Sequence, residues 1–147
     1  MLTLDGLPFA ASRARFLDKE PASQERSAKI YVTVEFPGLS HSLAQLDTGA
    51  AWSVLDLATA EALELLDGDG DRERMRTHVG IVEGKLERVP LKLFAEEGDS
   101  LAIEATFLVS RDWPGRTFLG YTGLLDRVRI ALDPSPGKNW FYFGEVD

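Results

Sequence analysis

Short segments with the composition of β-strands follow one another along most of this 147-residue chain, and they constrain its fold more than any other feature. Residues 30–36 (Ile-Tyr-Val-Thr-Val-Glu-Phe) are the clearest case, because β-branched and aromatic residues pack well on a pleated surface. Pro37-Gly38 then ends this segment. The expected strands cover residues 30–36, 42–46, 77–82, 85–94, 101–110, 117–120, 128–132 and 140–143. Their spacing predicts an all-β fold, either a small barrel or a sandwich.

Turns and helices are expected at a few places between these strands. Glu83-Gly84 is the expected tight tip of a hairpin over residues 77–94. Asp56 can cap a helix whose apolar stripe continues to residue 67, where a glycine follows. A second, short helical stretch is expected over residues 122–127. The prediction is therefore an all-β fold with one or two short helices.

The chain divides into an arm and one domain. Apolar residues in segment 1–28 show no clear period, so this segment is interpreted as an N-terminal arm. Residues 29–147 are expected to form a single domain, because a chain of this length can bury a core of its own.

Charge and composition exclude several classes of function. The net charge of −8 argues against nucleic acid and against an anionic membrane as the main partner. The absence of cysteine excludes disulfides and thiolate metal sites. No apolar run reaches membrane-spanning length, and Asp5-Gly6 interrupts the start of the chain in a way that signal peptides do not. A soluble, cytoplasmic protein is expected.

No metal or cofactor is expected either. Asp67-Gly68-Asp69-Gly70-Asp71 begins like a calcium loop, but its sixth position is Arg72 and its twelfth is His78. His41 and His78 share no metal-ligand spacing and are interpreted as surface residues.

Asp47-Thr48-Gly49 is the pattern that carries chemistry. It directly follows the expected strand 42–46, in an apolar setting that includes Leu46 and Ala50. The Asp supplies a carboxylate, the Thr a hydroxyl, and the Gly allows a sharp turn and the close approach of another chain. A carboxylate in a dry site is costly unless it is hydrogen-bonded or shares a proton.

Two such carboxylates placed face to face can share one proton and perform acid–base chemistry on a water molecule. The chain contains only one Asp-Ser/Thr-Gly sequence, so a pair requires two copies related by a two-fold axis. Asp-Thr-Gly is also ordinary turn chemistry, and a structural turn in an unrelated small β-barrel remains an alternative.

Residues 46–50, followed by Ser53-Val54-Leu55, resemble the active-site segment of retropepsin-like aspartic proteases of the retroviral and bacterial type. Members of this family carry a later segment of two apolar residues and Gly, threaded behind the active-site loop, and Phe118-Leu119-Gly120 matches it. The hairpin over residues 77–94 lies where their flap would, and residues 140–143 match the terminal strand of their dimer interface. The resemblance implies a retropepsin-like closed β-barrel of the acid protease fold.

The resemblance also implies a function, that of an aspartic endopeptidase that hydrolyses a peptide or protein substrate as a homodimer. Asp47 would be the catalytic residue, with Thr48 bracing the two loops and Gly49 contacting substrate backbone. The substrate-binding residues would be Ala50, Ala51, Val79, Gly80, Ile81, Val82 and Gly84. No cofactor is implied.

The chain departs from the retroviral pattern at two linked positions. Retroviral members carry an Asp two places after the motif Gly and an Arg after the later Gly, where this chain has Ala51 and Tyr121. Both partners of that ion pair are absent together, so no charge is left unpaired. This departure leaves open the alternative of a catalytically inactive module of the same fold that binds peptides or proteins or serves dimerisation.

Overall fold

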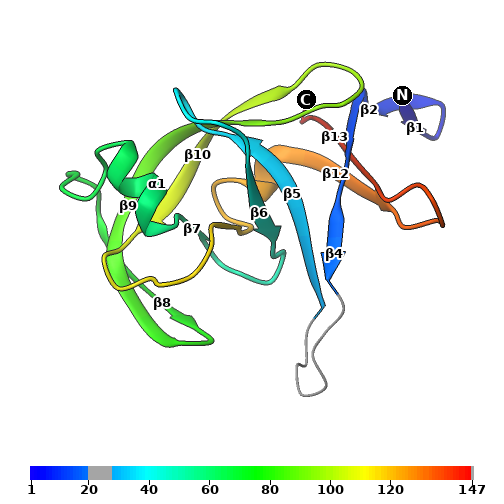
Figure 1. The fold of residues 1–147 in the computed structure, drawn as a ribbon. Helices are drawn as coiled ribbons and strands as arrows, with labels where there is room; N and C mark the ends of the chain where they lie inside the picture. The colour runs from blue at the N-terminus through cyan, green and yellow to red at the C-terminus, as the bar shows by residue number, and fades with distance from the viewer. Residues whose placement is uncertain (20–27, 147) are drawn as a thin grey trace.

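The computed structural model describes residues 1–19 and 28–146 and shows a protein built mainly of β-strands (Figure 1). The strands are β1 (Leu2–Leu4), β2 (Leu7–Ala10), β3 (Ser12–Arg15), β4 (Leu17–Lys19), β5 (Lys29–Glu35), β6 (Ser42–Leu46), β7 (Ser53–Val54), β8 (Arg72–Thr77), β9 (Gly80–Leu93), β10 (Leu101–Val109), β11 (Phe118–Leu119), β12 (Val128–Asp133) and β13 (Trp140–Glu145). One α-helix, α1 (Leu57–Ala62), and one 3-10 helix, η1 (Leu125–Arg127), interrupt them. The expectation of an all-β fold with one or two short helices is confirmed.

The largest sheet joins strands from most of the chain in the order β4-β5-β6-β11-β7-β10-β9-β8. An additional pairing joins β5 to β9, with Val34 opposite Leu93. The pairings therefore lead from β5 through β6, β11, β7, β10 and β9 back to β5. The β6–β11 and β7–β10 pairs are parallel, and the other pairs in this sheet are antiparallel.

Strand β10 separates two clusters of buried side chains, because successive residues of a strand point to opposite faces. Phe107 belongs to the main core, which also takes Val32 and Val34 from β5. Its neighbour Leu108 belongs to a smaller cluster with Val54, Val82, Trp113 and Phe118. This second cluster brings together the Asp47 side of the sheet and the β8–β9 hairpin.

Within the described part of the expected N-terminal arm, residues 1–19, β1 and β2 pair only with each other, whereas β3 and β4 pair with strands of the rest of the protein. β3 pairs with β13, and β4 pairs with β5. Ala14 and Phe16 are buried in the main core. No period was visible in the sequence because each strand is only three or four residues long. Residues 20–27 of the expected arm lie outside the described residues.

Strand β13 contains the aromatic segment expected at a dimer interface. It is the central strand of a three-stranded sheet with the order β12-β13-β3. Both of its backbone edges are therefore hydrogen-bonded within the chain, and neither is free for a partner's strand.

The predicted hairpin tip at Glu83-Gly84 is wrong. The turn consists of His78 and Val79, between β8 and β9, and Gly80 follows with a φ of 108°. Gly84 lies within β9, where an added Cβ would fall well inside van der Waals contact of the Val109 carbonyl. Glycine in a strand marks such a close backbone approach as readily as it marks a turn.

Helix α1 begins as predicted but is shorter than predicted. The Asp56 carboxylate caps it by accepting a hydrogen bond from the Thr59 amide at 2.9 Å. The helix ends at Ala62 instead of residue 67, and Glu64 has left-handed backbone (φ 58°). Leu65 and Leu66 pack on the core from irregular backbone. Among the described residues, no helix is long and apolar enough to cross a membrane.

Candidate active site

The loop that carries Asp47 connects two strands that are not neighbours. It leaves β6 and enters β7, and β11 lies between these two strands. Its backbone is bonded to the threaded segment on both sides: the Asp47 amide donates to the Leu119 carbonyl at 3.0 Å, and the Tyr121 amide donates to the Ala50 carbonyl at 2.9 Å. Residues 47–52 therefore form a loop that is held around β11.

Gly120 and Ser53 fix the place where the Asp47 loop passes around β11. A Cβ at Gly120 would fall well inside van der Waals contact of the Trp52 carbonyl, so only glycine fits there. The Gly120 amide donates to the hydroxyl of Ser53 at 2.8 Å, and Ser53 is fully buried. The crossing thus leaves little freedom for the position of the loop.

The Asp47 carboxylate is half-buried at the end of β6 and accepts a hydrogen bond from the Gly49 amide at 3.2 Å. Thr48, Gly49 and Ala51 are exposed beside it. Within residues 1–19 and 28–146, no Lys, Arg or His side chain forms an ion pair with Asp47. The carboxylate is held in place yet open to water and to another molecule.

Asp56 and Thr117 brace the loop from behind. The Thr117 hydroxyl donates to the Asp56 carboxylate at 2.7 Å and accepts from the Asp56 amide at 2.9 Å. Burial raises the pKa of Asp56, but hydrogen bonds from Thr117 and Thr59 outweigh it and hold the pKa below its ordinary value. This contact ties the start of α1 to the residue that precedes β11.

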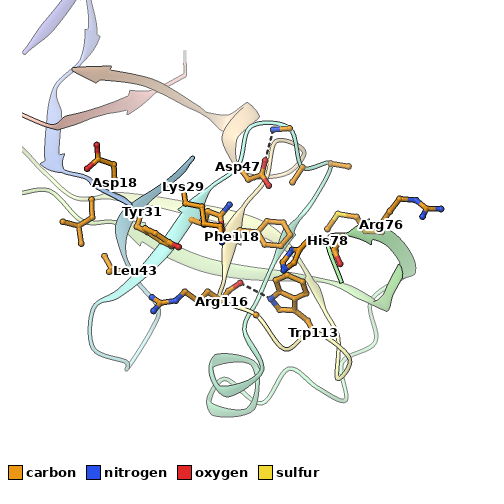
Figure 2. A pocket seen from close by; sticks show the side chains of 18 residues that line it. Asp18, Lys29, Tyr31, Leu43, Asp47, Arg76, His78, Trp113, Arg116 and Phe118 are labelled. Atoms are coloured by element: carbon orange, nitrogen blue, oxygen red, sulfur yellow. Dashed lines mark hydrogen bonds between the residues drawn. The ribbon is translucent and has the colours of Figure 1, made fainter. Parts of the chain in front are cut away.

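A cleft of about 1320 Å³ opens beside the loop and includes Asp47, Gly49, Ala50 and Ala51 in its lining. Figure 2 shows Asp47 between two groups of labelled side chains, with Tyr31 and Leu43 on one side and Trp113 and His78 on the other. The remaining wall comes from β8 and the turn after it: Met75, Arg76, Thr77 and His78. This hairpin and the strands β5 and β6 face each other across the cleft.

Aromatic side chains form one wall of the cleft. Trp113 makes edge-to-face contacts with His78 and Phe118, at centroid distances of 5.6 and 5.4 Å. The Trp113 indole donates to the carbonyl of Arg116 at 3.0 Å, which fixes the turn at Trp113-Pro114-Gly115. Apolar and aromatic walls with a few polar groups are typical of ligand sites.

The structure separates the predicted site residues into two groups. Asp47, Gly49, Ala50 and Ala51 line the cleft, and Thr48 lies exposed next to them. Away from the cleft lining, the predicted flap residues fall into three places. Val79, Gly80 and Ile81 are exposed at the hairpin turn, Val82 is buried in the smaller core cluster, and Gly84 packs against β10.

Several cleft residues were missed by sequence reasoning. Leu43 and Gln45 share a strand face with Asp47, because alternate residues point the same way, so counting back in steps of two could have found them. Tyr31 and Phe118 lie beside Gln45 in the sheet register. Their approach depends on strand pairing, and the sequence contains no local signal for it.

Among the described residues, no group of three or more His, Asp or Glu side chains is arranged to hold a metal ion. No model of a known protein family matches the sequence, and a search of curated proteins finds no match.

Proposed function

We propose that this chain is an aspartic endopeptidase of the retropepsin type that acts as a homodimer, with Asp47 from each copy forming the catalytic pair. The observation that carries the proposal is the loop around β11, which presents a half-buried carboxylate in the lining of a large cleft. An ordinary surface turn that carries an Asp does not require a loop that passes around another strand. The cleft is also large enough for several residues of an extended peptide.

The ring of strand pairings supports a retropepsin-like closed barrel as the fold. It runs through β5, β6, β11, β7, β10 and β9 and returns to β5. The threading of Phe118-Leu119-Gly120 behind the Asp47 loop also matches the family pattern, since β11 lies between β6 and β7.

The surface next to Asp47 suits a second copy of the chain. Thr48, Ala51, Tyr121 and Thr122 are exposed there, and none of them carries a charge. A two-fold axis brings identical groups together, so an uncharged surface avoids like-charge repulsion. Only the two Asp47 carboxylates would then repel each other, and sharing one proton removes that repulsion.

The proposed chemistry follows from this shared proton. The ionised Asp47 takes a proton from a water molecule, while the protonated Asp47 of the second copy donates a hydrogen bond to the peptide carbonyl. Water attacks directly, and no covalent intermediate with the enzyme forms. Tyr31 and Leu43, which line the cleft and are only partly buried, contact apolar parts of the substrate, and Thr48 braces the two loops.

The test compares wild type with Asp47→Asn on an unbiased peptide mixture from about pH 3 to 7, the range in which carboxyl pairs titrate. Asp69→Asn is the matched control, because Asp69 is exposed and lies outside the cleft. Wild type and the control are expected to cleave, whereas Asp47→Asn is inactive although folded. The wild-type rate should fall more steeply than linearly on dilution, since two chains build one site. If folded dimers of wild type cleave nothing, the proposal fails and the alternative of an inactive binding or dimerisation module is supported.

A further inference from the structure

Arg116 stands out among the charged residues of the cleft. The lining contains three basic side chains, Lys29, Arg76 and Arg116, against the two carboxylates of Asp18 and Asp47, although the whole chain carries a net charge of −8. The Arg76 side chain points away from the other labelled residues in Figure 2, whereas Arg116 extends toward Tyr31 and Leu43. A basic group in the cleft of an acidic protein calls for an explanation of its own.

The Arg116 guanidinium has no acidic partner in the part of the chain that the structure describes. It lies over the Tyr31 ring, with 5.6 Å between Cζ and the ring centroid. Two exposed arginines elsewhere in the described residues, Arg74 and Arg111, do have acidic partners, Glu83 and Asp67. The donors of Arg116 are therefore free to bind a ligand from within the cleft.

The backbone around Arg116 is fixed, so the side chain starts from a defined position. Its carbonyl accepts the hydrogen bond from the Trp113 indole, and Gly115 packs so tightly against the Trp113 ring that a Cβ would not fit. On the other side, the Thr117 carbonyl accepts from the Gln45 amide at 3.0 Å. A guanidinium held over an aromatic ring loses less freedom on binding a partner than one in open solvent.

The sheet register places Arg116 near the catalytic carboxylate. Phe118 lies opposite Gln45 in the parallel β6–β11 pair. Two residues earlier on each segment, Arg116 therefore lies level with Leu43. Leu43 and Asp47 are four residues apart on one strand face, a span of about 13 Å. An extended peptide with its scissile bond at Asp47 thus presents a side chain to Arg116 within about four residues of that bond.

We propose that Arg116 determines specificity by binding a side-chain carboxylate of the substrate, so that the cleft selects peptides with Glu or Asp within four residues of the cleavage site. The inference rests on the proposed endopeptidase function and adds its substrate class. Arginine suits this task because its planar donors bind both oxygens of a carboxylate.

The test uses sets of peptides that differ only by Glu, Gln or Lys at one position, scanned over four residues on each side of a cleaved bond. Binding is measured by fluorescence anisotropy in the Asp47→Asn background at pH 6, and cleavage is measured in parallel with an active Asp47. A preference for Glu of about tenfold or more is expected at one position, the size of a charge-assisted hydrogen bond. Arg116→Gln should abolish the preference, and Arg116→Glu should replace it with a preference for Lys.

Arg111→Gln is the control, because Arg111 is also an exposed arginine but pairs with Asp67 outside this cleft. It should keep the preference for Glu. The preference should also fade as the pH is lowered through about 4.3, where a Glu side chain of the substrate becomes neutral. Equal binding of Glu and Gln peptides at every position, or a preference that survives Arg116→Gln, would overturn the inference. A wild type that cleaves without this preference defeats the inference alone, whereas absence of cleavage defeats the proposed function.

Discussion

At the scale of single residues, the position of the Asp47 loop depends on side chains that lie behind it and outside the cleft lining. Thr117 is buried, and its hydroxyl both donates to the Asp56 carboxylate and accepts from the Asp56 amide. A buried hydroxyl of this kind satisfies two polar groups at once. Its loss leaves the Asp56 amide without an acceptor and leaves the Asp56 carboxylate only its hydrogen bonds from Thr59. Thr117 therefore couples the helix cap to the strand that passes through the loop.

Replacement of Thr117 by Val keeps the shape and removes the hydroxyl. We expect Thr117→Val to lower the free energy of unfolding at pH 7 by about 1–2 kcal/mol, while Thr117→Ser retains most of the stability. The difference is measured by urea unfolding at a series of pH values.

The pH dependence of this effect follows from Asp56. Its folded pKa lies below the ordinary value of 3.8, so its contribution is present above that value and is lost as the pH falls through the folded pKa. The difference in the free energy of unfolding between wild type and Thr117→Val should therefore be constant at neutral pH and become smaller below about pH 3.8. A gap that is the same at pH 3 and pH 7 would contradict the role of the ionised Asp56.

At the scale of elements, the β8–β9 hairpin separates residues that pack in the core from residues that are exposed and free to contact a ligand. Alternate residues of β9 are divided between solvent and core, as Ile81 is 49% exposed while Val82 is buried. Arg74 and Glu83, opposite each other in the pair, form an ion pair at 3.0 Å between their side chains. Val79, in the turn itself, is also about half exposed. Neither Val79 nor Ile81 belongs to the clusters of buried side chains, so core packing does not explain why these two positions are apolar.

The double change Val79→Ser with Ile81→Ser tests whether the hairpin turn covers the substrate. It should leave the melting temperature unchanged within about 2 °C, because exposed positions contribute little to stability. It should raise KM about tenfold or more, because two apolar side chains lose their burial against the peptide. Leu132→Ser, which alters a similarly exposed residue on β12, is the control and should leave KM unchanged. An unaltered KM in the double variant would place the turn outside the site.

At the scale of the whole molecule, one chain supplies only half of the proposed chemistry. A single Asp47 carboxylate lacks the neighbour with which to share a proton, so assembly and activity should change together. The exposed, uncharged residues beside Asp47 are the surface proposed for that assembly, and Tyr121, at 54% exposure, is the largest of them.

Tyr121→Glu introduces a charge on this surface and, through a two-fold axis, introduces it twice. We expect the dissociation constant of the dimer to increase by at least about tenfold, because like charges brought together at an interface cost several kcal/mol. Sedimentation across a concentration series measures the dissociation, and cleavage rates measured on the same samples should fall in parallel. Leu4→Glu places the same charge at an exposed apolar residue of β1 and should alter neither quantity. A dimer that withstands Tyr121→Glu must use another surface.

The sequence by itself determined the local features of this protein. The β-branched and aromatic residues of segment 30–36 identify β5, and a carboxylate before Leu57 identifies the start of α1. Asp47-Thr48-Gly49 marks the loop for which the chemistry is proposed. Each of these follows from neighbours along the chain, because strand periodicity and helix capping act over a few residues. Gly84 shows the limit of local sequence patterns, because a tight turn and a close backbone approach both favour glycine and the sequence does not distinguish them.

The tertiary structure alone decided which residues meet at the cleft. Tyr31, Trp113 and Arg116 come from separate segments of the sequence, and strand register and a hydrogen-bonded turn bring them to the same cleft. It also decided that β3 pairs with β13, which joins the start of the chain to its end. Such pairings depend on the packing of the whole core, and no local pattern of polar and apolar residues specifies which strand lies beside which.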